Sequence, residues 1–245
     1  MRFLGKVALV TGAAVGIGRS TAIMLASEGA KIIAIDINKK GLEELEVELR
    51  KYTSDVVTCV CDVSDEQSVN SAVEKGKLAL GTIDILVNNA ALWRDVSSFL
   101  ETPTSLWKKY LDINVMGVVY CTRAVLKDMI NKKYGRVINV SSVAGVYGKA
   151  DMVHYSATKA AVITMTAALA REVAKDGVLI NCVSPGSVSP SENNDMDYYC
   201  ESDLAYMGRT GTDNENANLI CFLASDEASY ISGQNIQIDG CRKFL

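Results

Sequence analysis

The fold of this chain is decided close to its start, where residues 7–18 read VALVTGAAVGIG. An apolar, β-branched run of the kind that forms a buried strand meets a glycine-rich turn, and a helical pattern begins at about Ile17. Glycine permits a tight turn and lets backbone amides approach a pyrophosphate with no Cβ in the way. The helix that follows directs its positive end at such an anion. The segment therefore predicts a strand, a phosphate-binding turn at Gly12, Gly16 and Gly18, and a helix.

Strand and helix patterns alternate along the rest of the chain. The strand patterns lie at about 6–12, 31–36, 56–61, 84–88, 135–140, 178–183 and 235–238. The helical patterns lie at about 17–28, 40–51, 66–80, 104–130, 155–175 and 213–224. Such alternation predicts parallel strands joined by right-handed crossovers, with helices on both faces of the sheet. We expect one doubly wound Rossmann-type α/β domain over residues 1–245, with about seven parallel strands.

The second strand pattern ends in an acid, Asp36, eighteen residues after Gly18. This is close to the distance at which a carboxylate accepts hydrogen bonds from an adenosine ribose. A carboxylate there repels the 2′-phosphate of NADP, and neither Ala13, Ala14 nor Ile37 supplies the arginine that NADP favours. The sequence therefore predicts NAD(H) as the cofactor.

Tyr155 and Lys159 stand four residues apart, which is one helical turn, so the phenol and the ammonium share a helix face. A cation beside a tyrosine favours the phenolate and so predicts a pKa below the usual value of about 10. Such a tyrosine can act as a general acid or base near neutral pH. His154 is adjacent, but neighbouring helix positions point about 100° apart, so we expect it to face the substrate loop or solvent.

Together these motifs resemble the short-chain dehydrogenase/reductase family, and the resemblance runs from about Lys6 to Asp239. The residues that carry it are Thr11-Gly12 with Gly16-Ile17-Gly18, Asp62-Val63, Asn88-Asn89-Ala90, Asn114, Ser142, Tyr155 with Lys159, and Pro185-Gly186. They occur in the family's order and at ordinary spacing. The resemblance implies a Rossmann-type enzyme that transfers a hydride between a nicotinamide and a secondary alcohol or ketone.

The resemblance also implies a role for each matched residue. Tyr155 would be the acid/base, and Lys159 would lower its pKa and hold the nicotinamide ribose. Ser142 would bond the substrate oxygen, and Asn114 would anchor a proton-conducting water chain. Ser141 is a rival to Ser142, but the thirteen-residue step to Tyr155 favours Ser142. The implied cofactor-binding residues are Gly12, Gly16, Ile17, Gly18, Asp36, Asp62, Val63, Asn89, Tyr155, Lys159, Pro185, Gly186 and Val188.

Two positions depart from the family pattern. Ala91 replaces the glycine that usually follows Asn-Asn-Ala, which narrows the floor of the expected nicotinamide pocket. Pro190 stands where the family usually has a threonine that holds the nicotinamide carboxamide. Ser189 or Ser191 is the candidate to replace it after a shift of one residue.

Composition excludes several classes of protein. The net charge is −4 and there is no basic run, so nucleic acid and anionic membranes are not expected partners. No apolar run reaches the length of a membrane span, and the first strand begins too early for a signal peptide. The seven cysteines indicate buried free thiols in a reducing cytosol, and the single histidine argues against a metal site. We therefore expect a cytoplasmic protein.

The segment from Ser187 to Met207 follows the sixth strand at the ligand-binding edge of the predicted sheet. Its length and clustered acids predict a mobile lid that closes over the ligands, and a fixed surface helix is the alternative. The acids are Glu192, Asp195, Asp197, Glu201 and Asp203, an unfavourable surface for an anionic acyl carrier or coenzyme A.

Aromatic and apolar residues at the expected pocket predict a bulky, mostly apolar alcohol or ketone, such as a hydroxysteroid. They are Trp93, Tyr147, Met152, Tyr198, Tyr199 and Tyr206. A 3-oxoacyl thioester reductase and a non-catalytic NAD-binding sensor or scaffold remain as alternatives. The resemblance also implies a homotetramer or homodimer, and alanines 160, 161, 167 and 168 suit close helix packing across a two-fold axis.

Overall fold

A computed structural model describes residues 1–191 and 194–243 of the chain. Residues 192, 193, 244 and 245 lie outside the described residues, and Glu192 of the predicted acidic loop is among them. In the part of the chain that is described, no helix combines the length and the apolar character needed to cross a membrane.

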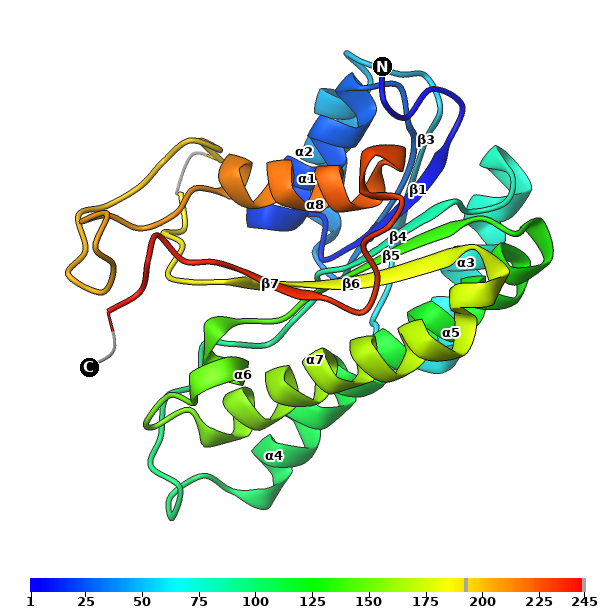
Figure 1. Cartoon of the computed structure of the whole chain (residues 1–245). Coiled ribbons are helices and arrows are strands. Elements are labelled where there is room, and N and C mark those ends of the chain that lie inside the picture. The colour runs from blue at the N-terminus through cyan, green and yellow to red at the C-terminus, as the bar shows by residue number, and fades with distance from the viewer. Residues whose placement is uncertain (192–193, 244–245) are drawn as a thin grey trace.

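One seven-stranded parallel sheet forms the centre of the molecule, with strand order β3-β2-β1-β4-β5-β6-β7 (Figure 1). The strands are β1 (Val7–Thr11), β2 (Lys31–Asp36), β3 (Val56–Val60), β4 (Ile85–Asn88), β5 (Gly135–Val140), β6 (Val178–Pro185) and β7 (Asn235–Ile238). The predicted doubly wound α/β fold with seven strands is confirmed. Because the order reverses between β1 and β4, a ligand-binding crevice is expected at their carboxyl ends.

Helices cover both faces of the sheet (Figure 1). The α-helices are α1 (Gly16–Ser27), α2 (Lys39–Leu49), α3 (Glu66–Leu80), α4 (Thr104–Leu111), α5 (Gly117–Lys132), α6 (Val143–Tyr147), α7 (Val153–Val173) and α8 (Asp213–Ala224). Short 3₁₀ turns follow at η2 (Ala174–Asp176) and η3 (Asp226–Ala228). Along β1, Ala8 and Val10 pack in the core beneath α1, α2 and α8, whereas Val7 and Leu9 pack in the core beneath α3, α5 and α7. This alternation is the two-residue period of a strand buried on both faces.

The predicted continuous helix over 104–130 is wrong, because a π-helical segment, η1 (Asp112–Met116), divides it into α4 and α5. Asn114 lies in this segment and is 1% exposed. Its side chain bonds the backbone of Leu92 and the Thr158 hydroxyl, which belong to other parts of the fold. A wide turn of this kind is frequent where a side chain is re-aimed at a functional site.

Two further boundaries differ from expectation near β5. The expected loop after β5 contains the short helix α6, whose N-terminus Ser142 caps by accepting a hydrogen bond from the Ala144 amide. Helix α7 begins at Val153 rather than at Tyr155, so residues 153 and 154 belong to its first turn. Helix ends are the least certain part of a sequence-based prediction, and differences of one or two residues are usual. A five-residue helix such as α6 is too short to give a clear periodic pattern.

Candidate active site

The glycine-rich turn lies between β1 and α1 and has the close packing that its sequence predicts. Gly12 has a φ of +61°, and a side chain on it would lie 2.8 Å from the Cα of Ala90. A side chain on Gly18 would lie 2.2 Å from the carbonyl oxygen of Gly12. These two glycines therefore let the turn close against β4 and α1. Gly16 has a φ of +60°, and among the described residues the Asp213 carboxylate is the one group within 4 Å of the position that its side chain would take, at 3.7 Å and 4.0 Å.

Asn89 supports this turn from the end of β4. Its amide nitrogen donates to the carbonyl oxygens of Thr11 at 3.1 Å and Gly12 at 3.0 Å. The Thr11 hydroxyl in turn accepts from the backbone amides of Asn89 and Ala90. Asn89 thus links the end of β4 to the end of β1 and holds the turn in place. The sequence predicts Asn89 as a cofactor-binding residue and does not predict these bonds.

Asp36 ends β2 beside the glycine-rich turn, as predicted. One carboxylate oxygen accepts from the Ala14 amide and the other from the Asn38 amide, each at 2.9 Å. Asp62 follows β3, is exposed, and accepts hydrogen bonds from the backbone and hydroxyl of Ser64. Val63 beside it is 8% exposed and belongs to the core. Acidic side chains therefore lie at the carboxyl ends of two neighbouring strands, Asp36 at the end of β2 and Asp62 after β3.

Ser142, Tyr155 and Lys159 are brought together by the packing of α6 on α7. A side chain on Gly145 would lie 2.6 Å from the backbone carbon of Lys159, so only glycine permits this contact. Ser142 is close enough to Tyr155 for a hydrogen bond that lowers the pKa of the phenol. The hydroxyl of Ser141 instead donates to the Lys159 carbonyl at 2.7 Å and is buried. The geometry therefore favours Ser142 over Ser141 as the serine of the site.

Lys159 is 3% exposed, and its ammonium donates to the carbonyl oxygen of Val140 at 2.7 Å. The Nζ atom lies 5.8 Å from the centre of the Tyr155 ring. Burial lowers the pKa of Lys159 to about 8, against a small opposing effect of Cys182. Lys159 therefore lies beside the phenol, as the one-turn spacing predicts.

The expected depression of the Tyr155 pKa is wrong. Burial raises the pKa of Tyr155, and the hydrogen bond with Ser142 only partly opposes this effect. The physical reason is desolvation, which disfavours a buried phenolate more than its neighbours favour it. The phenol is consequently protonated at neutral pH, as a proton donor must be.

His154 does not face the substrate loop or solvent, and that expectation is wrong. The residue is 0% exposed. Its ring packs edge-on against Tyr110, with ring centres 4.3 Å apart, and against Trp107 at 6.0 Å. Both aromatic residues come from α4, which packs on the first turn of α7. Tyr110 also contacts the Tyr155 ring edge-on, with ring centres 6.4 Å apart, so the aromatic residues of α4 pack against the first turn of α7.

The chain between β6 and α8 carries the remaining predicted residues. Pro185 ends β6, and the Gly186 amide donates to the Ile238 carbonyl at 2.9 Å. Val188 forms an isolated β-bridge with Gly211, so the beginning of the segment after β6 lies beside its end, just before α8. The Ser189 hydroxyl bonds Thr210 at 2.9 Å, whereas the Ser191 hydroxyl accepts from the Asp195 amide.

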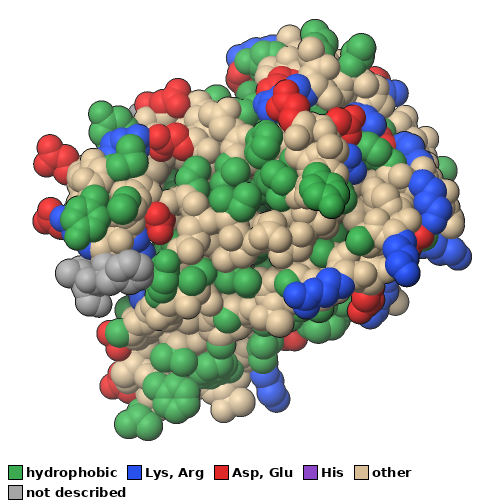
Figure 2. Space-filling view, in the orientation of Figure 1, with side chains coloured by type: hydrophobic (Ala, Val, Ile, Leu, Met, Phe, Trp, Pro, Cys, Tyr) green, Lys and Arg blue, Asp and Glu red, His purple; other side chains and the backbone are tan. Residues whose placement is uncertain are grey.

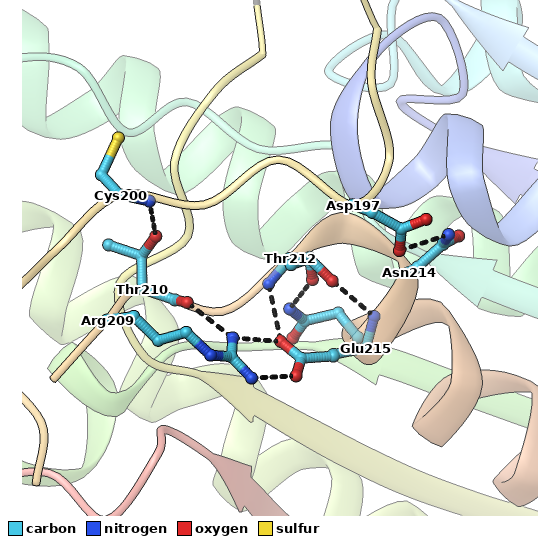
Figure 3. A network of polar contacts seen from close by, with 8 residues as sticks. Asp197, Cys200, Arg209, Thr210, Thr212, Asn214 and Glu215 are labelled. Carbon is cyan, nitrogen blue, oxygen red and sulfur yellow. Dashed lines mark hydrogen bonds and ion pairs between the residues drawn. The ribbon is translucent and has the colours of Figure 1, made fainter. Parts of the chain in front are cut away.

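The described part of the predicted substrate loop 187–207 contains no helix and is attached to the start of α8 (Figure 3). Arg209 binds Glu215 through two guanidinium nitrogens, at 2.6 Å and 3.0 Å. Glu215 also accepts from the Thr212 amide and completes a capping box. Asp197 accepts from the Asn214 side chain at 2.8 Å. Acidic side chains lie on the outer surface of this projecting loop (Figure 2).

The aromatic and apolar residues predicted to line the pocket fall into two groups. Met152 is buried at 5% exposure, so it is part of the protein interior. The others are exposed, namely Trp93, Tyr147, Tyr198, Tyr199 and Tyr206. Sequence reasoning missed Gly145, Thr158 and Asp213, which contact the predicted site across the fold. No local sequence signal identifies them, because their partners are distant in the chain.

Comparison with known proteins agrees with this geometry. Residues 6–197 match the family model described as short chain dehydrogenase. The chain belongs to the short-chain dehydrogenase/reductase family. It is accordingly an oxidoreductase that acts on CH–OH groups, and the family predicted from the sequence is confirmed.

Several relatives within the short-chain dehydrogenase/reductase family match along almost the whole chain. The 3-oxoacyl-(acyl-carrier-protein) reductase FabG of Thermotoga maritima is 40% identical over 243 residues, 98% of each chain. The enzyme of the same name from Escherichia coli is 37% identical over 247 residues, again 98% of each. Among solved structures, NAD⁺-bound xylitol dehydrogenase superposes with a TM-score of 0.91 at 32% identity, covering 98% of this chain and 100% of its own.

Proposed function

We propose that the protein is an NAD(H)-dependent oxidoreductase that interconverts a secondary alcohol and a ketone. The observation that carries this proposal is the convergence of Asn114, Ser142, Tyr155 and Lys159 in a fold whose glycine-rich turn is bonded to Asp36 at the end of β2. A non-catalytic NAD-binding sensor would need the turn but not this set of side chains. Gly16 leaves no Cβ at the N-terminus of α1, which is where a pyrophosphate is expected to bind.

In this mechanism a bound nicotinamide supplies or accepts the hydride. For reduction, Tyr155 donates its phenolic proton to the carbonyl oxygen as the hydride reaches the carbon, which leaves an alcohol and a phenolate. Ser142 bonds the same oxygen and keeps it beside the phenol. The Lys159 ammonium stabilises the phenolate, and its pKa of about 8 suits proton return near neutral pH. The Asn114 side chain donates to the Leu92 carbonyl and to the Thr158 hydroxyl, and so it ties the chain after β4 to α7.

The cofactor preference follows from Asp36. A 2′-phosphate about 4 Å from its carboxylate would cost about 1–4 kcal/mol, depending on how much water remains. We expect kcat/KM to favour NAD(H) over NADP(H) by at least about tenfold, and Asp36→Asn to reduce that ratio. The measurement is initial-rate kinetics with both cofactors. Asp55→Asn removes a partly exposed acid that precedes β3, at the opposite edge of the sheet from Asp36. It is the control and should leave the ratio unchanged. Equal kcat/KM values for both cofactors in the unmodified protein would contradict the assignment.

For the substrate, we propose a neutral alcohol or ketone with a bulky, mostly apolar body, of which a hydroxysteroid is one example. The exposed Tyr198, Tyr199 and Tyr206 on the loop beside the site support this class. The acids of the same loop disfavour a strongly anionic substrate. Levodione reductase, a structural neighbour with a TM-score of 0.90 and 33% identity, is named for the reduction of a dione.

A 3-oxoacyl thioester is the second candidate, because FabG enzymes of Thermotoga maritima and Escherichia coli are similar along the whole chain. One experiment separates the two classes. Initial rates are measured by nicotinamide absorbance with acetoacetyl-coenzyme A, an acetoacetyl-acyl carrier protein, and a panel of neutral cyclic ketones and steroids. Faster turnover of the neutral ketones supports the first class, and faster turnover of either thioester supports the second. No turnover of any alcohol or ketone would contradict the proposed function.

The loop 187–207 is proposed to close over the bound ligands. Gly186 and Gly208 are the proposed hinges, and Gly208 has a φ of +72°. The loop is held to α8 by the Asp197–Asn214 bond, and its C-terminal side by the Arg209–Glu215 pair (Figure 3). We expect amide exchange in this loop to slow on addition of NAD and substrate, and exchange in α3 to stay constant. Hydrogen–deuterium exchange with mass spectrometry measures both, and strong, equal protection of the loop in the two states would contradict closure.

We propose assembly as a homotetramer, or as a dimer within it, through α5 and α7. The helix α7 presents small residues on its outer side: Ala168 is exposed, and Ala160 and Ala161 are partly exposed. Such residues let two helices approach closely across a two-fold axis. Light scattering at micromolar concentration should give a mass of two or four chains. Replacement of Ala168 by Glu should shift the protein toward smaller species, and a monomeric unmodified protein would refute the proposal.

A further inference from the structure

Asp213 is an acid beside the predicted cofactor site that no motif identifies. It is the first residue of α8 and is 8% exposed. Its two carboxylate oxygens lie 3.7 Å and 4.0 Å from the position that a side chain on Gly16 would occupy. Because Gly16 is the first residue of α1, the carboxylate lies against the N-terminus of that helix. This is the end of the helix at which a dinucleotide pyrophosphate is expected.

The Asp213 carboxylate has no compensating partner within residues 1–191 and 194–243, where no hydrogen bond or ion pair reaches its oxygens. The charged groups on the elements packed around it are Arg19 of α1, Asp197 of the loop, and Glu215 with Arg209 at the start of α8. Arg209 is engaged with Glu215. Burial raises the pKa of Asp213 to about 6, with no charged neighbour contributing.

We infer that Asp213 couples dinucleotide binding to proton uptake, because its carboxyl group must be neutral when a pyrophosphate occupies the N-terminus of α1. The inference rests on the proposed function, since it requires a nicotinamide dinucleotide at the glycine-rich turn. Two anions at one helix terminus repel each other, and the buried aspartate is the one that can be neutralised by a proton. A protonated Asp213 also becomes a hydrogen-bond donor toward the anion.

The proton balance fixes the direction of the effect. One proton passes from solvent to the Asp213 carboxylate, and no other bond changes. Well below pH 6 the group is already protonated, so binding takes up no proton. Above that pH the free protein holds the carboxylate, so binding must take up a proton and the dissociation constant rises with pH. The rise approaches a limit of about tenfold per pH unit when a full proton is taken up.

Isothermal titration calorimetry with NAD⁺ between pH 5.5 and 7.5 tests this inference. Lys159, with a pKa of about 8, stays mostly protonated at pH 7, where the protons are counted, and the Asp213→Asn variant keeps whatever contribution Lys159 makes. At pH 7 the titration is repeated in two buffers of different ionisation enthalpy, which counts the protons taken up. We expect on the order of half a proton or more for the unmodified protein. Asp213→Asn should take up almost none and should bind NAD⁺ about tenfold more tightly at pH 7.5.

Asp203→Asn is the matched control, because it removes an exposed acid from the nearby loop and should keep the proton uptake. Thermal melting verifies that each variant is folded, and the proton count on the unmodified protein requires no variant. The inference is overturned if the unmodified protein takes up no proton, or if Asp213→Asn takes up as many as the unmodified protein. Binding of NAD⁺ with no such linkage leaves the proposed function standing, whereas absence of NAD⁺ binding at every pH overturns both.

Discussion

Tyr155→Phe should abolish turnover while leaving NAD binding almost unchanged. The substitution removes only the hydroxyl that exchanges a proton with the substrate, and positioned acid–base groups contribute roughly 10²–10⁴-fold to rate. We therefore expect kcat to fall by about that factor, with the dissociation constant of NAD changed less than about threefold. The aromatic ring remains to fill the space beside Tyr110. Steady-state kinetics and calorimetric NAD binding give the two values.

Tyr110→Phe is the matched control for this experiment. Tyr110 is fully buried and contacts the Tyr155 ring, and its hydroxyl bonds the carboxylate of Asp95 at 3.0 Å. Its loss should lower the melting temperature and leave most of the turnover. A Tyr155→Phe variant with the kcat of the unmodified protein would show that another group transfers the proton.

Lys159→Met should abolish activity and at the same time stabilise the ligand-free protein at neutral pH. The ammonium is buried with one carbonyl partner, and burial lowers its pKa from 10.5 to about 8. That difference corresponds to roughly 3 kcal/mol. The Val140 carbonyl loses its donor in the variant, which costs about 1 kcal/mol. We expect a net gain of about 2 kcal/mol and a melting temperature higher by roughly 4–8 °C. Turnover and NAD affinity should both fall, because one side chain serves the phenolate and the ribose.

The stability gain of Lys159→Met should depend on pH. Below about pH 8 Lys159 is charged in both the folded and the unfolded chain, so the full cost of burying the ammonium is present. Between about pH 8 and 10.5 the unfolded chain keeps the proton and the folded protein releases it, so the unmodified protein gains stability. The stability difference between Lys159→Met and the unmodified protein should therefore shrink from pH 8 to 10. Lys175→Met, at an exposed lysine after the same helix, should show neither effect. A difference that stays constant with pH would contradict the buried-charge explanation.

The Lys159 prediction is an example of a general relation between buried charge and stability. A charge buried for its chemistry destabilises the protein that holds it, and stabilising substitutions at such positions usually remove function. Asp213 shows the same property beside the glycine-rich turn, where burial raises its pKa to about 6. The proposed site therefore holds a buried acid near the expected pyrophosphate and, beside Tyr155, a buried ammonium whose described hydrogen bond goes to the Val140 carbonyl.

Sequence alone determined the succession of strands and helices along the chain, the parallel direction of the strands, the glycine-rich turn, and the positions of Asp36, Tyr155 and Lys159. These features follow from local rules: two-residue and 3.6-residue periods, the steric demands of glycine, and the four-residue spacing of one helical turn. They require no knowledge of which distant segments touch.

Tertiary structure alone decided the environment of those residues. The approach of α6 to α7 at Gly145, the burial of His154 beneath α4 and the contact of Asp213 with Gly16 all join segments that no local pattern connects. The π-helical turn at Asn114 likewise depends on partners at Leu92 and Thr158. Desolvation and charge pairing depend on which atoms pack together, so the raised pKa of Tyr155 and the lowered pKa of Lys159 come only from the folded chain.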